Sequence, residues 1–316
     1  MPHPANRRQI LQAGAASVAA GLTLAATPSA TQAQDANRKQ DAFRYCLNTS
    51  TIRGQKLPLV EEIRLASAAG YSGIEPWIRE ITQYQESGGK LPALRKRLAD
   101  AGLAVESAIG FASWIVDDDA QRAQGLEDAK RDMALVRAIG GTRIAAPPAG
   151  ARAPIALNAI ADRYAKLLEL GEQMGVTPQL ELWGPSKAIS RLGQLMFIAS
   201  EAGHADACML PDVYHIYKGG SDFHGLQVIN GQAIHCFHMN DYPAQPPRAT
   251  IGDKDRVYPG DGIAPLTQIL NTLYDTGFRG ALSLELFNPT YWQQDAETVV
   301  KTGLAKMQAA VKQAFA

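Results

Sequence analysis

From residue 43 onward, short apolar and β-branched runs alternate with longer segments in which apolar residues recur at helical spacing. The short runs predict strands and the longer segments predict amphipathic helices. We expect strands at 43–51, 71–77, 103–110, 142–147, 176–183, 206–212, 233–239 and 279–287. We expect helices at 57–69, 91–101, 119–139, 155–174, 189–202, 223–231, 263–276 and 295–314. The pattern therefore predicts eight strands that alternate strictly with eight helices.

This alternation favours one fold class over others. Strands that are joined through helices must be parallel. Glycines such as Gly70 and Gly175 follow the expected helices, at the position where a residue with positive φ is favoured. Eight such units predict a single-domain α/β protein, a (β/α)8 TIM barrel. An open, doubly wound sheet is the main alternative. It would favour a GxGxxG turn after the first strand, and residues 46–54 contain none.

The first 33 residues have the order of a signal peptide. Arg7 and Arg8 precede a mildly apolar run from Ala13 to Ala26, and small and polar residues follow. This run is too short to span a bilayer, and the paired arginines are similar to a twin-arginine export signal. A frayed N-terminal helix is the alternative. We expect a signal peptide at 1–33, a short linker at 34–42 and the barrel at 43–316, with export to the periplasm or beyond through the twin-arginine machinery.

Composition narrows the classes of partner. Lys and Arg total 31, and Asp and Glu total 31, so the net charge gives no field for a nucleic acid, which we exclude as a partner. The three cysteines, Cys46, Cys208 and Cys236, lack the spacing of a metal site. We expect buried thiols, with a Cys208–Cys236 disulfide as the weaker alternative. The sequence leaves a homo-oligomer open.

The ends of the last four expected strands carry the candidate chemistry. They place Glu181, Asp212, His238 and Glu285 in otherwise apolar runs. Active sites of barrels lie at the carboxyl ends of the strands, and a charge in an apolar run is costly unless it is paired or metal-bound. A divalent cation would relieve the repulsion among three carboxylates. Mostly oxygen ligands favour Mn²⁺ first, then Mg²⁺ or Co²⁺, so we expect one such ion as cofactor.

These residues belong to motifs with a family likeness. The motifs are Leu-Glu-Leu-Trp-Gly-Pro at 180–185, Pro-Asp-Val-Tyr-His at 211–215, His-Met-Asn-Asp-Tyr at 238–242, Pro-Gly-Asp-Gly at 259–262 and Leu-Glu-Leu-Phe at 284–287. Over about residues 43–312 the sequence resembles the xylose isomerase-like TIM barrels of the sugar phosphate isomerase/epimerase group. That group includes ketose 3-epimerases, hydroxypyruvate isomerase and inosose dehydratase.

The resemblance implies a role for each matching residue. Glu181, Asp212, His238 and Glu285 would bind the metal, and Glu181 and Glu285 would also be the catalytic acid/base pair. His215 and Arg256 would hold substrate oxygens. The sequence departs from the family at Asn240, where many relatives carry lysine, and in the long proline-rich stretch 243–256. We expect both to lie beside the substrate. Of the properties that the resemblance implies, the identity of the substrate is therefore the one that can least be carried over to this protein.

A few further residues are weaker candidates for substrate binding. Trp183, Trp114 and Phe111 lie just past strand ends, where they would either wall a sugar-sized pocket or pack in the core. Glu75 ends the second strand, and we expect it to contact the substrate or a metal ligand.

The expected reaction is metal-dependent isomerisation or epimerisation of a sugar, by proton abstraction next to a carbonyl. The small-molecule substrate would be a non-phosphorylated keto-sugar or polyol, because cells keep phosphorylated intermediates inside. A lyase or dehydratase that performs β-elimination on 3-keto-glycosides is the first alternative, and a non-catalytic sugar-binding barrel is the second. A DNA-repair endonuclease would need more histidines and a basic face.

Overall fold

The structure is a computed structural model that describes residues 39–316. The expected signal peptide and the first part of the linker lie outside the described residues.

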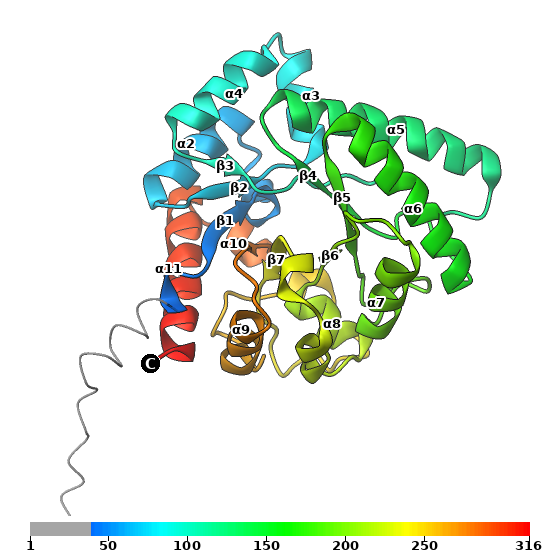
Figure 1. Cartoon of the computed structure of the whole chain (residues 1–316). Helices are drawn as coiled ribbons and strands as arrows, with labels where there is room; N and C mark the ends of the chain where they lie inside the picture. Colours follow the sequence, from blue (N-terminus) through cyan, green and yellow to red (C-terminus); the bar gives the residue numbers. More distant parts are fainter. Residues whose placement is uncertain (1–38) are drawn as a thin grey trace, which may run out of the picture.

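Eight parallel strands form the centre of the molecule (Figure 1). They are β1 (Arg44–Asn48), β2 (Gly73–Glu75), β3 (Ala104–Val105), β4 (Arg143–Ala146), β5 (Thr177–Glu181), β6 (Met209–Leu210), β7 (Cys236–Met239) and β8 (Ala281–Leu284). Regular pairing gives the orders β3-β2-β1-β8-β7 and β4-β5-β6.

Short contacts close these two sheets into one ring. The parallel bridge between Asp212 and His238 continues β6 onto β7. At the other junction the amide of Ala145 donates to the carbonyl of Ala108, 2.8 Å away, which joins the end of β3 to β4. The ring confirms the predicted single-domain (β/α)8 barrel, and the open-sheet alternative is wrong.

Helices cover the outside of the ring (Figure 1). The principal ones are α2 (Leu59–Ala69), α4 (Leu91–Asp100), α5 (Asp119–Ala138), α6 (Leu157–Met174), α7 (Leu192–Glu201), α9 (Leu266–Asp275) and α11 (Ala296–Ala314). Each lies within three residues of a predicted boundary, because the apolar stripe that buries a helix is visible in the sequence. The segment predicted as a helix at 223–231 is instead the 3₁₀-helix η2 (Phe223–Val228) and the start of η3 (Gly231–Ala233), so that prediction is wrong.

Short helices that the pattern does not predict follow several strands. They are η1 (Thr49–Gln55), α3 (Ile78–Glu86), α8 (Val213–Gly219), η4 (Asp253–Asp255) and α10 (Pro289–Trp292). Too few turns are present for an apolar period to show, and local caps fix most of them instead. Asp212 caps α8 by accepting from the amide of His215 at 2.6 Å. These helices build the rim around the carboxyl ends of the strands.

The core has two parts. Leu180 and Leu182, which flank Glu181, are fully buried in the large core between strands and helices. Cys46 and Cys236 belong to a small apolar cluster formed mainly by strand residues. All three cysteines are free and buried, so the predicted core thiols are confirmed and the Cys208–Cys236 disulfide is wrong.

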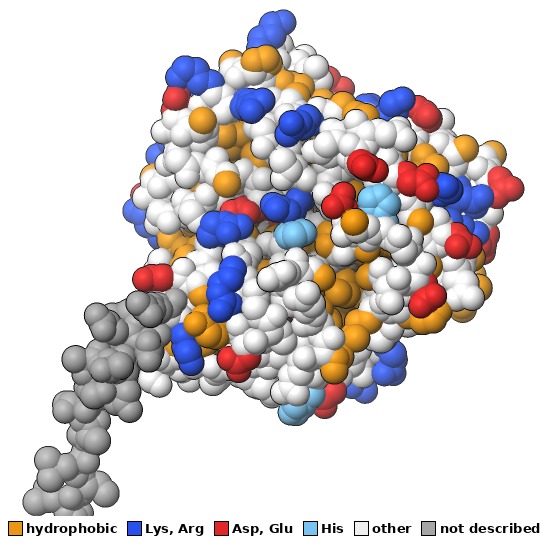
Figure 2. Space-filling view, viewed as in Figure 1, with side chains coloured by type: hydrophobic (Ala, Val, Ile, Leu, Met, Phe, Trp, Pro, Cys, Tyr) orange, Lys and Arg blue, Asp and Glu red, His pale blue; other side chains and the backbone are white. Residues whose placement is uncertain are grey.

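The surface carries no single dominant charge in view. Figure 2 shows basic and acidic side chains interspersed over the visible face. Among the described helices, none is long and apolar enough to cross a bilayer.

Candidate active site

Glu181, Asp212, His238 and Glu285 meet at the carboxyl ends of β5 to β8. Nδ1 of His238 lies 3.3 Å from Oε2 of Glu285, 3.8 Å from Oδ2 of Asp212 and 3.9 Å from Oε1 of Glu181. All four side chains are buried. The structure therefore brings together the set that the strand ends predicted, with one ring nitrogen facing three carboxylates.

The other nitrogen of His238 is held from behind by Glu75. Nε2 lies 3.1 Å from Oε2 of Glu75, and that carboxylate also accepts from Asn48 Nδ2 at 2.9 Å and from Ser283 Oγ at 2.7 Å. Glu75 has no exposed surface. A carboxylate behind a histidine fixes the ring orientation and leaves the opposite nitrogen free to bind a metal. Glu75 thus contacts a candidate metal ligand, which is the second of its two expected roles.

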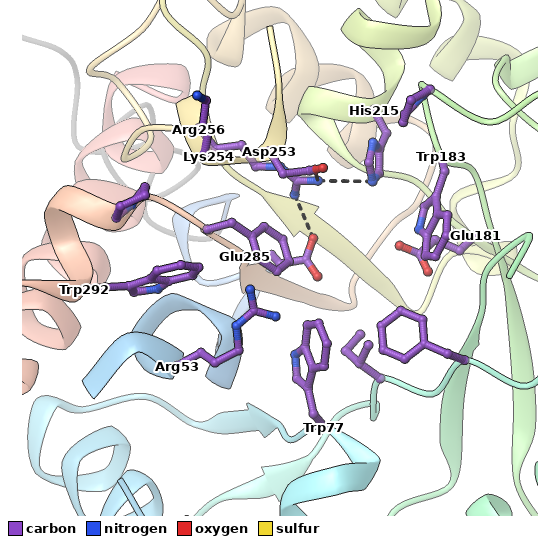
Figure 3. Close-up of a pocket in the computed structure, with 15 residues that line it drawn as sticks. Arg53, Trp77, Glu181, Trp183, His215, Asp253, Lys254, Arg256, Glu285 and Trp292 are labelled. Atoms are coloured by element: carbon purple, nitrogen blue, oxygen red, sulfur yellow. Dashed lines mark hydrogen bonds and ion pairs between the residues drawn. The ribbon is translucent and has the colours of Figure 1, made fainter. Parts of the chain in front are cut away.

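Arg256 binds the cluster from the opposite side. Its Nη1 donates to Oδ2 of Asp212 at 3.0 Å and to Oε2 of Glu285 at 2.7 Å. Its Nη2 lies 3.1 Å from Nε2 of His215 and donates to Asp253 Oδ1 at 2.6 Å. One guanidinium therefore connects two candidate metal ligands with two further side chains of the cavity. Figure 3 shows its contacts with Glu285 and His215.

The charges of the cluster are strongly coupled. Burial raises the pKa of Glu181 to about 8, against the attraction of His238. Burial would also raise the pKa of Glu285, but attraction to His238 and Arg256 outweighs it and lowers that pKa. Burial would lower the pKa of His238, but Glu285 and Glu75 raise it well above its ordinary value. The buried carboxylates therefore favour a positive charge at the centre of the cluster, here on His238 and Arg256.

The residues present fit a divalent cation. Nδ1 of His238 is buried and lacks a hydrogen-bond partner among the described residues. Ligand atoms that share a metal at roughly 2.0–2.2 Å lie about 3–3.5 Å apart, close to the spacing between this nitrogen and the nearest carboxylate oxygen. Asp212, His238 and Glu285 offer ligand atoms within 4.8 Å of one another. Glu181 lies beside this group, with Oε1 3.9 Å from Nδ1 of His238, and is the candidate for a fourth ligand.

A cavity of about 540 Å³ opens above the cluster. Glu181, Glu285, His215 and Arg256 line it, as does Trp183. This volume lies in the range of roughly 300–1,000 Å³ that is typical of pockets for small molecules. The predicted acid/base pair and three of the predicted substrate-binding residues therefore share one cavity.

Two residues expected beside the substrate lie elsewhere. Trp114 is 1% exposed, donates its indole N–H to the carbonyl of Pro147 at 2.9 Å and packs against Tyr164, so it is a core residue. Asn240 is fully buried and bridges the amide of Tyr214 to Oδ2 of Asp212. It positions a candidate ligand and does not line the cavity.

The long stretch 243–256 does reach the cavity. Lys218 on α8 donates to the carbonyls of Arg248, Ala249 and Ile251 at 3.1, 3.1 and 2.8 Å. These bonds anchor the stretch beside the helix that Asp212 caps. They hold Asp253 and Arg256 over the site, so this stretch contributes side chains to the cavity wall.

Sequence reasoning missed several aromatic residues of the wall. Trp77, Phe287 and Trp292 line the cavity together with Phe111 and Trp183. Ring centroids lie 5.1 Å apart for Trp77 and Phe111, 6.0 Å for Phe111 and Trp183, and 6.1 Å for Trp77 and Phe287. Each missed residue lies just after a strand or in a short helix. Such a position places the residue at the rim, but the sequence does not show whether its side chain points into the cavity.

Comparison with known proteins places this chain in a family. The model of the family described as xylose isomerase-like TIM barrel matches residues 63–310. Inosose isomerase of Bacillus velezensis is 27% identical over 290 residues, which cover 86% of this chain and 99% of the relative. Inosose isomerase of Halalkalibacterium halodurans is 34% identical over 138 residues, 43% of this chain, and that match spans about half of the relative (49%).

Solved structures agree on the fold. The IOLI protein with a binding zinc atom superimposes with a TM-score of 0.80 at 23% identity, covering 86% of this chain and 99% of that one. L-ribulose 3-epimerase superimposes with a TM-score of 0.70 at 21% identity, covering 86% of this chain and 95% of that one. From the family match and the closed barrel, this chain belongs to the xylose isomerase-like TIM barrel family, whose curated relatives here are isomerases, epimerases and dehydratases.

Proposed function

We propose that the protein is a metal-dependent sugar isomerase or epimerase that acts on a non-phosphorylated keto-sugar or polyol. One observation carries the proposal: Nδ1 of His238 faces three buried carboxylates at the base of a sugar-sized cavity. Glu181, Asp212, His238 and Glu285 would hold one divalent cation. When bound, the cation would polarise the substrate carbonyl and stabilise the negative charge that forms when a neighbouring proton leaves.

The identity of the ion is part of the proposal. Three oxygen ligands and one nitrogen favour Mn²⁺, with Mg²⁺ or Co²⁺ as substitutes. The solved relative with a zinc atom makes Zn²⁺ a required member of any metal panel. Loading before export would protect an Mn²⁺-type site from tighter-binding metals outside the cytoplasm.

The two glutamates differ in their surroundings, which suggests their roles. Glu285 is held by Arg256 and by Asn48, whose Nδ2 donates to Oε1 at 3.2 Å. Glu181 borders the cavity, pairs with no arginine among the described residues, and lies 3.9 Å from Nδ1 of His238. A carboxylate that no arginine holds is free to exchange a proton, and a bound cation would lower the raised pKa of Glu181. Glu181 would then be the base that takes the proton. Glu285, which reaches the cavity from another strand (Figure 3), would exchange the proton on the other side.

His215 and Arg256 would hold the substrate oxygens. Burial lowers the pKa of His215 to about 4, so its ring is neutral at pH 7. A guanidinium can only donate, so Nε2 of His215 accepts from Nη2 of Arg256 at 3.1 Å and orients that group, and both side chains line the cavity (Figure 3). Donors placed at a developing oxyanion lower the barrier to proton abstraction. Export through the predicted signal peptide supports an unphosphorylated substrate.

A lyase that performs β-elimination is the second candidate. The chain is 24% identical to 3-dehydroshikimate dehydratase of Pseudomonas aeruginosa over 73% of its own length and 36% of that relative. The proton abstraction is shared, and elimination follows when a leaving group stands two bonds away. The aromatic wall above the cluster offers contact area beyond a single sugar ring, as a 3-keto-glycoside would require.

One experiment separates these functions. Metal-loaded protein is incubated in D₂O with D-fructose, D-tagatose, D-psicose and an aryl 3-keto-glucoside. Deuterium at the carbon beside the carbonyl indicates an isomerase or epimerase, and release of the aglycone indicates a lyase. Glu181→Gln should lower the observed rate by about 10²–10⁴-fold.

The matched control is Glu106→Gln. Glu106 is equally buried but pairs with Arg44, 2.6 Å away, and does not line the cavity. Its variant should keep the wild-type rate. If the protein binds sugars but no member of the panel gains deuterium or releases its aglycone, the proposed function is refuted. The non-catalytic sugar-binding barrel is then the remaining alternative.

A further inference from the structure

Arg53 lies in the cavity wall, in an aromatic cage that no sequence motif predicted. It belongs to η1, directly after β1. Its guanidinium carbon is 5.0 Å from the ring of Trp77, 5.2 Å from that of Phe287 and 5.0 Å from that of Trp292. Figure 3 shows this side chain extending between Trp77 and Trp292 toward the cavity. Cation–π contacts of this kind hold a guanidinium in place by its faces.

The N–H donors of Arg53 are free. Among residues 39–316, none accepts a hydrogen bond from its side chain or forms an ion pair with it within 4.0 Å. Arg256, the other arginine of this wall, contacts three carboxylates. A partly buried cation without an acceptor is unfavourable unless a ligand supplies one. The rings cover Arg53 without using its donors, which leaves those donors for a bound molecule.

The shape of the group limits what it can bind. A guanidinium offers a planar fork of N–H donors that matches the two oxygens of a carboxylate. Phosphate sites usually add backbone N–H groups at a helix N-terminus or further cations, whereas aromatic rings surround Arg53. With a divalent ion on the four candidate ligands, the cavity would not repel an anion, because Arg53, Lys254 and Arg256 also line it.

We propose that Arg53 binds a carboxylate on the substrate and so selects a keto-sugar acid over the neutral sugar. This inference rests on the proposed function, since it takes the metal cluster as the place where the carbonyl end of the same molecule binds. Trp77, Phe287 and Trp292 position the guanidinium, and Arg53 is the residue that determines specificity.

Matched ligand pairs test the proposal. D-Fructuronate and D-fructose differ at C6, which is a carboxylate in the first and a hydroxymethyl group in the second, and D-tagaturonate and D-tagatose differ in the same way. Titration calorimetry on the metal-loaded protein measures each Kd. We expect at least one carboxylate to bind tenfold or more tightly than its neutral partner. Arg53→Gln should remove that preference, and Arg53→Lys should keep part of it.

Arg79→Gln is the matched control. Arg79 lies 4.8 Å from the same Trp77 ring but is exposed and does not line this cavity. Its variant should keep the wild-type preference. Equal affinity within both pairs, no measurable binding of either acid, an unchanged preference in Arg53→Gln, or an equal loss in Arg79→Gln would each overturn the proposal. Deuterium exchange into the neutral sugars by wild-type protein reports separately on the proposed function, so the two can fail independently.

Discussion

At the scale of single residues, the site depends on how His238 is held. Its Nε2 faces Glu75 and its Nδ1 faces Glu285, Asp212 and Glu181. Glu75 in turn is fixed by Asn48 and Ser283. The ring therefore cannot rotate without breaking several buried hydrogen bonds, and the nitrogen that faces the carboxylates stays available for a cation.

Glu75→Gln should weaken metal binding while the fold persists. The amide can still contact Nε2 but lacks the charge that raises the basicity of the ring, and such partners usually contribute 10–100-fold to metal affinity. Competition with a chromogenic chelator would measure the Kd for Mn²⁺ and Zn²⁺. Glu106→Gln, which replaces a buried carboxylate paired with Arg44, is the control and should leave both Kd values unchanged. Unaltered affinity in Glu75→Gln would remove this role.

At the scale of elements, helices α2 and α3 each bury one carboxylate, Glu62 on α2 and Glu80 on α3. Glu62 on α2 is 1% exposed, and its Oε2 lacks a partner among the described residues. Burial, reinforced by repulsion from Glu80, raises the pKa of Glu62 to about 9. Glu80 accepts from Thr49 Oγ1 at 2.6 Å and from the amide of Trp77 at 3.0 Å. Glu80 therefore ties together two rim segments, η1 and the start of α3.

The raised pKa makes stability depend on pH. The folded chain binds the Glu62 proton more tightly than the unfolded chain does, so the contribution is fully present below the ordinary pKa and is lost as pH rises toward about 9. Glu62→Gln keeps a neutral side chain at every pH. Between pH 5 and 9 the wild type should lose on the order of a few kcal/mol more than this variant, seen as a steeper fall in Tm. Glu61→Gln, at a half-buried neighbour that pairs with Arg64, should follow the wild type between pH 5 and 9. Parallel curves for wild type and Glu62→Gln would contradict the account.

At the scale of the whole molecule, the barrel and its four candidate ligands could be predicted because both follow from local patterns. Burial on both faces makes the strands apolar, so a lone Glu181 or His238 stands out at a strand end. The rim could not be predicted in the same way. Trp77, Arg53 and Trp292 lie in short segments without an apolar period, and only closure of the ring by β8 against β1 brings the last of these beside the first two. Trp114 shows the converse: its place after a strand predicted a rim residue, but its side chain is buried in the core.

Export is a property of the full chain and remains a prediction from residues 1–33. Replacing Arg7 and Arg8 together by lysine should block twin-arginine transport, because that pathway reads the arginine pair. Fractionation of cells that express the full chain would show the protein shifting from the exported to the cytoplasmic fraction. Arg38→Lys, beyond the expected cleavage region, is the control. Export that is unaffected by the double substitution would refute the twin-arginine assignment.

The central claim is that Glu181, Asp212, His238 and Glu285 bind one divalent cation, and direct metal binding tests it most sharply. Chelator-treated wild-type protein is titrated with Mn²⁺, Mg²⁺, Co²⁺ and Zn²⁺ by calorimetry, with Tm recorded alongside. We predict one ion per chain and a higher Tm, since a ligand at 100 times its Kd stabilises the fold by about 2.7 kcal/mol. Asp212→Asn and His238→Gln should lose both effects while Glu106→Gln keeps them. Absence of binding in the wild type, or binding that survives in Asp212→Asn and His238→Gln, would contradict the account.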